Sequence, residues 1–175
     1  LIYKNNGNGD LELMDLPQNL SGLWQTISTF DIDNDGDEDI LLGNWGTNTK
    51  FSLNFDDPLI MYHNDFDKNG KPETLLTYNN KGKYYPLNSK DELAGQMNVV
   101  NKVYTDHKSF AGKTINDIIG PKYLEKSTQY KVDILASGYI RNDNGSFNEF
   151  ITFPNDFQLA PITTFSKRKY FGFIL

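Results

Sequence analysis

The sequence predicts a mainly β fold, built from antiparallel hairpins and interrupted by a small helical insert. Three observations lead to this prediction. Short alternating or apolar runs are separated by Gly, Asn and Asp, as in strands joined by tight turns. One hairpin pattern occurs twice, near the two ends of the chain. Between the two copies, residues 88–128 lose the strand pattern and acquire helical periodicity and helix-capping signals.

Composition bounds the class of protein. The chain has 175 residues, 38% hydrophobic and 14% aromatic, which is enough apolar material for a buried core. Its net charge is −6 and it has no extended basic stripe, so we expect no nucleic-acid partner. The absence of cysteine excludes disulfides, zinc–thiolate sites and a thiol nucleophile. No run approaches the ~20 apolar residues of a membrane helix, so we expect no membrane span in this chain.

The repeated hairpin is the first element in chain order. Residues 3–9 and 139–145 each place Asn and Gly between apolar positions, which supplies the positive φ angles of a tight turn. The likeness continues at nearly the same offset, because Ile-Ser-Thr-Phe at 27–30 matches Ile-Thr-Thr-Phe at 162–165. This offset is longer than a four-stranded unit needs, so the sequence predicts an insertion between the copies.

Residues 23–87 are rich in strand signals. Ile, Leu, Phe, Tyr and Thr recur in short runs between turn residues. The expected strands are residues 23–30, 38–43, 59–64, 73–78 and 83–87.

Residues 88–128 form the predicted helical insert. Ser89 and Glu92 have the spacing of a capping box, which begins a helix. A second helix is expected over residues 108–119, and a third begins at Pro121, a residue suited to a first helical turn. We expect the apolar stripes of these helices to face a core rather than a cofactor.

The strongest chemical signal is the acidic loop 31–39, Asp-Ile-Asp-Asn-Asp-Gly-Asp-Glu-Asp. Carboxylates at positions 1, 3, 5 and 9, a Gly at position 6 for the sharp turn and a backbone carbonyl at position 7 suit a hard cation with six to eight oxygen ligands. Carboxylates this close repel one another unless a cation lies between them. Mg²⁺ is less apt because it demands tighter octahedral geometry. The expected Ca²⁺ ligands are Asp31, Asp33, Asp35, Asp37 through its backbone carbonyl, and Asp39.

A second loop, 65–73, repeats this spacing with less negative charge. Lys68 and Lys71 add positive charge to it, so we expect weaker Ca²⁺ binding than at the first loop. For both loops the alternative is an acidic turn between strands that binds no metal. The expected ligands are Asp65, Asp67, Asn69, Lys71 through its backbone carbonyl, and Glu73.

Neither loop is an EF-hand. That motif needs a Glu at position 12, where the two loops have Leu42 and Leu76. The flanking residues read as strands rather than helices. We therefore expect each metal at the tip of a β-hairpin.

Residues 1–9 and 30–43 together resemble the FG-GAP or VCBS repeat of integrin-α-like β-propellers. Residues 43–48 and 156–161 are further similar to propellers of bacterial surface proteins, especially from Bacteroidetes, that often carry ASPIC/UnbV domains. The resemblance covers most of residues 1–165. It implies a partial β-propeller of antiparallel four-stranded blades, Ca²⁺ at the first loop and an exported location.

The resemblance also predicts how the chain divides into blades. After residue 165 the family pattern requires another acidic loop, which the sequence lacks, so the last blade is atypical or truncated. The strands expected in this chain are too few to close a propeller, which normally takes 4 to 8 blades. We expect a propeller fragment over 1–165, followed by the start of a further blade over 155–175. The fragment comprises the end of one blade (1–22), a β-rich blade with two Ca²⁺ loops (23–87), the helical insert (88–128) and a closing hairpin (129–154).

The predicted function is that of an extracellular, calcium-binding module that binds a protein or glycan at the cell surface, as in cell adhesion, and performs no catalysis. Extracellular, periplasmic and outer-membrane surface locations all fit, with any secretion signal or anchor outside this stretch. The alternatives are an accessory or catalytic propeller of a polysaccharide-active enzyme and a purely structural scaffold. Against an enzyme, neither His63 nor His107 lies in a nucleophile elbow or a metal-ligand spacing. Candidate ligand-binding aromatic residues are Trp24, Trp45, Tyr84, Tyr85 and Tyr104.

Overall fold

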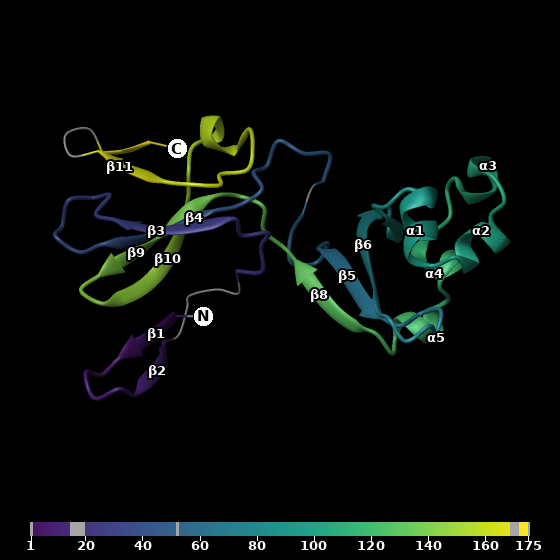
Figure 1. Cartoon of the computed structure of the whole chain (residues 1–175). Helices are drawn as coiled ribbons and strands as arrows, with labels where there is room; N and C mark the ends of the chain where they lie inside the picture. The colour runs from purple at the N-terminus through teal and green to yellow at the C-terminus, as the bar shows by residue number, and fades with distance from the viewer. Residues whose placement is uncertain (1, 15–19, 52, 169–171, 175) are drawn as a thin grey trace. The chain divides into compact units, whose positions relative to one another are not determined.

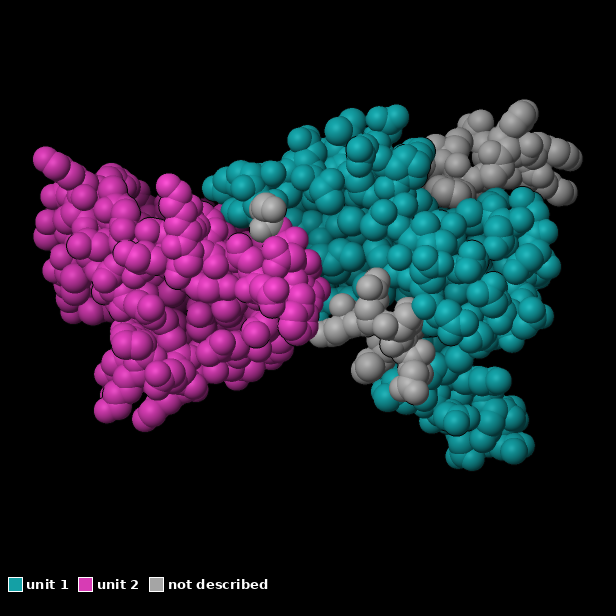
Figure 2. Space-filling view, turned by 180° about the vertical axis from the view of Figure 1, so that it is seen from behind, with its two compact units in different colours: residues 1–51, 134–175 teal, residues 52–133 magenta. Residues whose placement is uncertain are grey.

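The computed structural model describes residues 2–14, 20–51, 53–168 and 172–174. The prediction of a mainly β fold is confirmed, since every sheet in this part of the chain is antiparallel (Figure 1). The chain divides into two compact units. Unit 1 contains residues 1–51 and 134–175, and unit 2 contains residues 52–133 (Figure 2). Unit 2 is therefore inserted into the chain of unit 1.

Unit 1 is organised around one four-stranded sheet. Two hairpins that are far apart in sequence form it, and its strand order is β10-β9-β4-β3. The central pair is β4 and β9, in register through Leu41 and Tyr139. Its strands are β3 (Thr26–Phe30), β4 (Asp39–Gly43), β9 (Gly138–Asp143) and β10 (Ser146–Thr152).

Two separate hairpins complete the strands of unit 1, namely β1 (Ile2–Asn5) with β2 (Leu11–Met14) and β11 (Ser166–Arg168) with β12 (Gly172–Ile174). Both predicted hairpins are present: Tyr3 pairs with Leu13 in the first, and Tyr139 pairs with Ile151 in the second. Residues 169–171 and 175, within the expected further blade, lie outside the described residues, as do residues 15–19.

The core of unit 1 lies on one face of this sheet. Leu41, Phe153 and Ile162 are buried there, and Phe30 and Ile32 pack against them. A 3-10 helix, η1 (Asn155–Gln158), follows β10 and carries the chain back toward this core.

A buried polar network joins the segments on either side of the inserted unit. The N–H of Asn44 donates to Oγ of Ser137 at 2.9 Å, and the Asn44 amide donates to the carbonyls of Ile134 and Ala136. The N–H of Ser137 in turn donates to Oε1 of Gln158 at 2.9 Å. Asn44, Ser137 and Gln158 are all buried, so each satisfies polar groups that would otherwise lose their hydrogen bonds. Residues 43–48 and 156–161, set apart in the sequence, are thus held together.

Unit 2 has its own four-stranded sheet, of order β7-β6-β5-β8. The strands expected at 59–64, 73–78 and 83–87 are confirmed. The β-rich stretch 23–87, expected as one blade, supplies strands to both sheets, so each acidic loop belongs to a different sheet. The strands of unit 2 are β5 (Leu59–Asn64), β6 (Glu73–Asn80), β7 (Lys83–Pro86) and β8 (Thr128–Val132).

Short helices follow β7. The capping box at Ser89 is confirmed, with Ser89 and Glu92 satisfying each other's backbone N–H groups. The single helix expected over 108–119 is wrong. Gly112, at φ +73°, follows α3, and Thr114 caps a new helix, which divides the stretch in two. The helices are α1 (Lys90–Gln96), α2 (Val99–Val103), α3 (His107–Phe110), α4 (Ile115–Ile118) and α5 (Pro121–Leu124).

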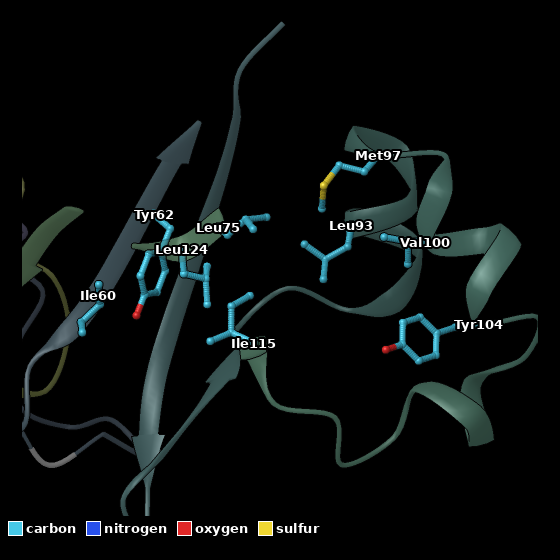
Figure 3. Packing of buried hydrophobic residues seen from close by; sticks show 9 residues of the cluster. All are labelled: Ile60, Tyr62, Leu75, Leu93, Met97, Val100, Tyr104, Ile115 and Leu124. Atoms are coloured by element: carbon cyan, nitrogen blue, oxygen red, sulfur yellow. The ribbon is translucent and has the colours of Figure 1, made fainter. Parts of the chain in front are cut away.

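These helices and the sheet enclose a second hydrophobic core (Figure 3). The insert is therefore more than a surface decoration, because its side chains complete the interior of unit 2. In the described residues, none of the helices is both long and apolar enough to cross a membrane, as predicted. The buried cluster comprises Ile60, Tyr62, Leu75, Leu93, Met97, Val100, Tyr104, Ile115 and Leu124.

Candidate metal centres

Both acidic loops lie at the tips of β-hairpins, as the sequence predicts. The first connects β3 to β4, and Phe30 pairs with Asp39 directly below it. The second connects β5 to β6, and Asn64 pairs with Glu73 in the same position. The strands hold the first and last residues of each loop at a fixed separation.

The two loops have the same backbone conformation. At position 4, Asn34 and Lys68 have φ angles of 61° and 60°. At position 6, Gly36 and Gly70 have φ angles of 100° and 87°, a region that side-chain-bearing residues rarely adopt. The Gly of the motif is therefore required by the turn itself in both copies.

Position 1 organises the first loop. The carboxylate of Asp31 accepts hydrogen bonds from the N–H groups of Asp35 at 3.2 Å and Gly36 at 3.1 Å. Oδ1 of Asp35 accepts one from the N–H of Asp37 at 2.9 Å. These bonds fold the chain around the carboxylate of Asp31.

The second loop repeats each of these bonds. Asp65 accepts from the N–H groups of Asn69 at 3.0 Å and Gly70 at 2.9 Å, and Oδ1 of Asn69 accepts from Lys71 at 2.8 Å. Asn at position 5 replaces Asp without changing the fold of the loop, because its carbonyl oxygen accepts the same bond.

Positions 2 and 9 fasten each loop to its hydrophobic core. Oδ2 of Asp39 accepts a 2.9 Å hydrogen bond from the N–H of Ile32, and Oε2 of Glu73 accepts a 2.7 Å bond from Phe66. The side chains of Ile32 and Phe66 pack against the cores of unit 1 and unit 2 respectively. Asp39 is 1% exposed and Glu73 is 4% exposed. Each loop therefore has a buried carboxylate at its base.

Three carboxylates converge in each loop. Asp31, Asp33 and Asp39 each place an oxygen so that the three atoms lie within 4.8 Å of one another, and Asp65, Asp67 and Glu73 do the same. An all-oxygen, anionic donor set of this kind fits a hard cation such as Ca²⁺. The residues at positions 1, 3 and 9 are thus brought together as the spacing predicts.

The side chains at positions 5 and 7 have other contacts. Asp35 and Asn69 use a side-chain oxygen to accept the N–H of position 7. Oδ2 of Asp37 accepts a 2.9 Å hydrogen bond from the N–H of Asn144, which is compatible with a role of Asp37 through its carbonyl rather than its carboxylate. Asp35, Asp37, Asn69 and Lys71 remain predicted ligands.

Negative charge accumulates in the first loop. Partial desolvation, together with repulsion from Asp35, Asp39 and Asp31, raises the pKa of Asp33 above its ordinary value. A hydrogen bond from the backbone of Asp35 opposes this rise in the pKa. Without a cation, the folded loop therefore resists ionisation of Asp33.

The hairpin β9–β10 supports the first loop, a feature that sequence reasoning missed. The N–H of Asn142 donates to Oδ1 of Asp39 at 2.9 Å, and the Asn142 amide donates to the carbonyl of Glu38 at 3.1 Å. The pairing of β4 with β9 brings these residues together across 103 positions of sequence. The Asn-rich turn at 139–145 was visible in the sequence, but nothing local indicated its neighbour.

The candidate aromatic residues occupy different environments. Tyr104 is buried in the core of unit 2, whereas Trp45 is 46% exposed. Trp24 is half-buried, and its Nε1–H donates to the carbonyl of Leu20 at 3.1 Å. Tyr84 packs against the core of unit 2, while Tyr85 lines a surface cleft.

Both histidines lie in unit 2. Nδ1 of His63 is 3.1 Å from Oγ1 of Thr74, next to the second acidic loop. Nε2 of His107 is 3.6 Å from a carboxylate oxygen of Asp91 on the exposed surface of the helices. His63 thus contacts a hydroxyl group, and His107 contacts an exposed carboxylate.

Comparison of the chain with family models, curated proteins and solved structures finds no match.

Proposed function

We propose that the chain is a Ca²⁺-binding module that binds one ion at each acidic loop. The observation that carries the proposal is the agreement between the two loops. They share backbone angles, hydrogen bonds and three converging carboxylates, although they lie in different units. Two loops with different neighbours are expected to keep one conformation when both are shaped for the same ion.

The two donor sets differ in the Ca²⁺ affinity that they are expected to give. The first loop adds the carboxylate of Asp35 to its three converging groups, whereas the second has the neutral Asn69 and two lysines. Higher negative charge strengthens Ca²⁺ binding. The first loop is therefore the stronger site.

The proposed ions stabilise the fold by relieving repulsion. Each base carboxylate is buried and already accepts a backbone N–H, so Ca²⁺ would link a buried group to two more accessible ones across the loop. The ion would therefore fasten each hairpin tip to the core below it. This role requires no catalytic chemistry.

We further propose that unit 1 is part of a β-propeller of the FG-GAP or VCBS type. Support comes from its four-stranded antiparallel sheet, in which the loop-bearing hairpin β3–β4 pairs with the repeated hairpin β9–β10. The hairpin β1–β2, a second copy of β9–β10, would belong to a neighbouring blade. Repetition of one hairpin type on successive sheets is how a propeller is built.

The function we propose is non-catalytic binding of a protein or glycan at the cell surface. Hairpin sites of moderate charge fill where free Ca²⁺ is near millimolar, which is the regime of extracellular modules. An exported location therefore follows from the proposed metal chemistry. Loops between the strands would then present the binding contacts on a rigid β scaffold.

Isothermal titration of the chelator-treated chain with CaCl₂ tests the metal proposal. We expect two sites of unequal affinity, with much weaker binding of MgCl₂ because Mg²⁺ demands tighter geometry. The matched control is Asp56→Ala, which removes an exposed carboxylate from a loop outside both motifs. Absence of Ca²⁺ binding at millimolar concentration would refute the proposal.

A further inference from the structure

Unit 2 contains a cleft between the β6–β7 hairpin and the connection that follows α3. Its volume is about 400 Å³. The hairpin contributes Tyr78, Asn80 and Tyr85, the end of α3 contributes Phe110, and the connection contributes Lys113. A space of this size is within the range of small-molecule sites in proteins, which are typically concave, largely aromatic and provided with a few polar groups.

The floor of the cleft is a pair of tyrosines. Tyr78 and Tyr85 are directly opposite each other on neighbouring strands. Their ring centroids are 6.1 Å apart and their planes are inclined by 34°. Because side chains alternate along a strand, Tyr84 points to the other face and packs against the core, which anchors β7 beneath the pair. The two rings therefore form a broad surface on a rigid hairpin.

The opposite wall is also fixed. Phe110 packs edge-on against Tyr104, with ring centroids 5.5 Å apart. Tyr104 is buried, and its hydroxyl donates to the carbonyl of Asp117 at 3.2 Å. The N–H of Lys113 donates to the carbonyl of Phe110 at 3.1 Å, which closes the turn. The wall is thus formed before any ligand arrives.

Polar groups border the aromatic surface. Asn80 and Lys113 lie at the cleft itself. Together these side chains offer both hydrogen-bond donors and acceptors.

We propose that this cleft binds a saccharide, with a sugar ring packed on Tyr78 and Tyr85. A sugar ring has an apolar C–H face for the aromatic floor and hydroxyl groups that both donate and accept hydrogen bonds. A proline-rich peptide also suits tyrosine surfaces, but it has few N–H groups for the acceptor oxygen of Asn80 in the cleft. The proposal rests on the proposed function of a binding module, but not on the calcium loops, which involve other residues.

Binding of soluble hexasaccharides tests the proposal. The panel contains hexamers of glucose, N-acetylglucosamine, xylose, mannose and galacturonic acid, titrated into the full chain in 2 mM CaCl₂, a concentration in about the range that fills extracellular sites. We expect at least one hexasaccharide to bind. Tyr85→Ala should weaken its affinity by roughly tenfold or more, as for other buried aromatic contacts.

Two further variants sharpen the result. Ala111→Trp leaves both tyrosines in place, puts a bulky ring at an exposed position lining the cleft, and should also weaken binding. Tyr130→Ala removes a 53% exposed tyrosine on β8, at the other edge of the sheet from β7, and should bind as the wild type does. Circular dichroism of each variant reports whether it is folded.

The outcomes separate this proposal from that for calcium. Failure of every hexasaccharide to bind would overturn the saccharide proposal, whether or not Ca²⁺ binds. So would affinities of Tyr85→Ala and Ala111→Trp equal to that of the wild type. Binding of a proline-rich peptide instead, lost in the same two variants, would reassign the cleft to peptides. Saccharide binding without calorimetric Ca²⁺ binding would leave the cleft proposal standing and remove the metal proposal.

Discussion

The backbone N–H of Asn142 donates a 2.9 Å hydrogen bond to Oδ1 of Asp39, the buried carboxylate at the base of the first acidic loop. The other oxygen of Asp39 accepts the N–H of Ile32, from within the loop. One carboxylate thus connects the loop, its own hairpin and the neighbouring hairpin β9–β10. The loop is consequently part of the sheet rather than an appendage to it.

The first prediction concerns the ranking of the two loops. Asp31→Ala should remove more of the Ca²⁺-induced rise in Tm than Asp65→Ala, because the first loop carries more negative charge. Binding to the native state alone adds about 2.7 kcal/mol at a hundredfold excess of free Ca²⁺ over Kd. Thermal melts in CaCl₂ and in EDTA measure the difference for each variant. The reverse order would contradict the ranking, and Asp56→Ala serves as the control.

The second prediction concerns Asp33. Its raised pKa means that the folded, metal-free chain holds this proton more tightly than the unfolded chain does. Stability contributed by the group is therefore present at low pH and is lost as the pH rises past the ordinary value of 3.8. Asp33→Asn should raise Tm in EDTA at pH 7 and reduce the further rise on adding CaCl₂. A fall in Tm in EDTA would be inconsistent with the repulsion we describe.

The third prediction concerns Asp39. Asp39→Asn keeps the shape of the side chain but has only one oxygen, which can accept from one of the two N–H donors, Ile32 and Asn142. The NH₂ group of the amide then faces the other N–H donor. An unsatisfied buried group of this kind costs about 1–3 kcal/mol. Urea denaturation in EDTA should therefore show a loss of stability larger than any gain from Asp33→Asn. Equal stability of wild type and Asp39→Asn would show that the two N–H groups have other acceptors.

The fourth prediction separates the two units. Leu75 and Leu41 are both fully buried, in the cores of unit 2 and unit 1 respectively. Truncation of a buried Leu to Ala costs about 2–5 kcal/mol. The helices α1 to α5 belong to unit 2, so far-ultraviolet circular dichroism at the helical minimum reports mainly on that unit. Leu75→Ala should lower the melting temperature of this signal more than Leu41→Ala does. Equal shifts would indicate that the units unfold together.

The fifth prediction tests the contact between residues 43–48 and 156–161. Gly46 has a φ of +89°, and a Cβ atom there would lie 2.6 Å from the carbonyl oxygen of Gln158. Gly7 has a similar φ of +86° but open space around it, so Gly7→Ala introduces the backbone strain without the clash. Gly46→Ala should therefore be the more destabilising by about 1–3 kcal/mol, the usual effect of overpacking. Equal denaturation midpoints for the two variants would argue against the contact.

Several features could be predicted from local sequence because their causes are local. The Asn-Gly turn at Asn144 follows from the preference of these residues for positive φ, and the helix after Ser89 follows from its capping box. The positions of the acidic loops at hairpin tips follow from strand-like residues on both sides. Within the candidate metal centres, the spacing singled out positions 1, 3 and 9, whose carboxylates converge, but also position 5, whose side chain accepts a backbone N–H.

The helix expected over 108–119 shows where local reasoning was incomplete. Its apolar spacing is helical throughout, but Thr114 and Asp117 form a capping box inside it, which begins a new helix. Reading this second box would have divided the stretch correctly. Gly112, at a positive φ, marks the same interruption.

The sequence by itself determined the elements of this protein and the composition of its acidic loops, because turns, caps and alternating strands depend on residues within a few positions of one another. Only the tertiary structure decided which hairpins share a sheet, that 52–133 form an inserted unit with its own core, and that Asn142 supports Asp39. The physical reason is that strand pairing is satisfied by backbone groups that every residue possesses, so the partner of a strand edge is not written in its own sequence. Burial of the side chains around it makes that choice.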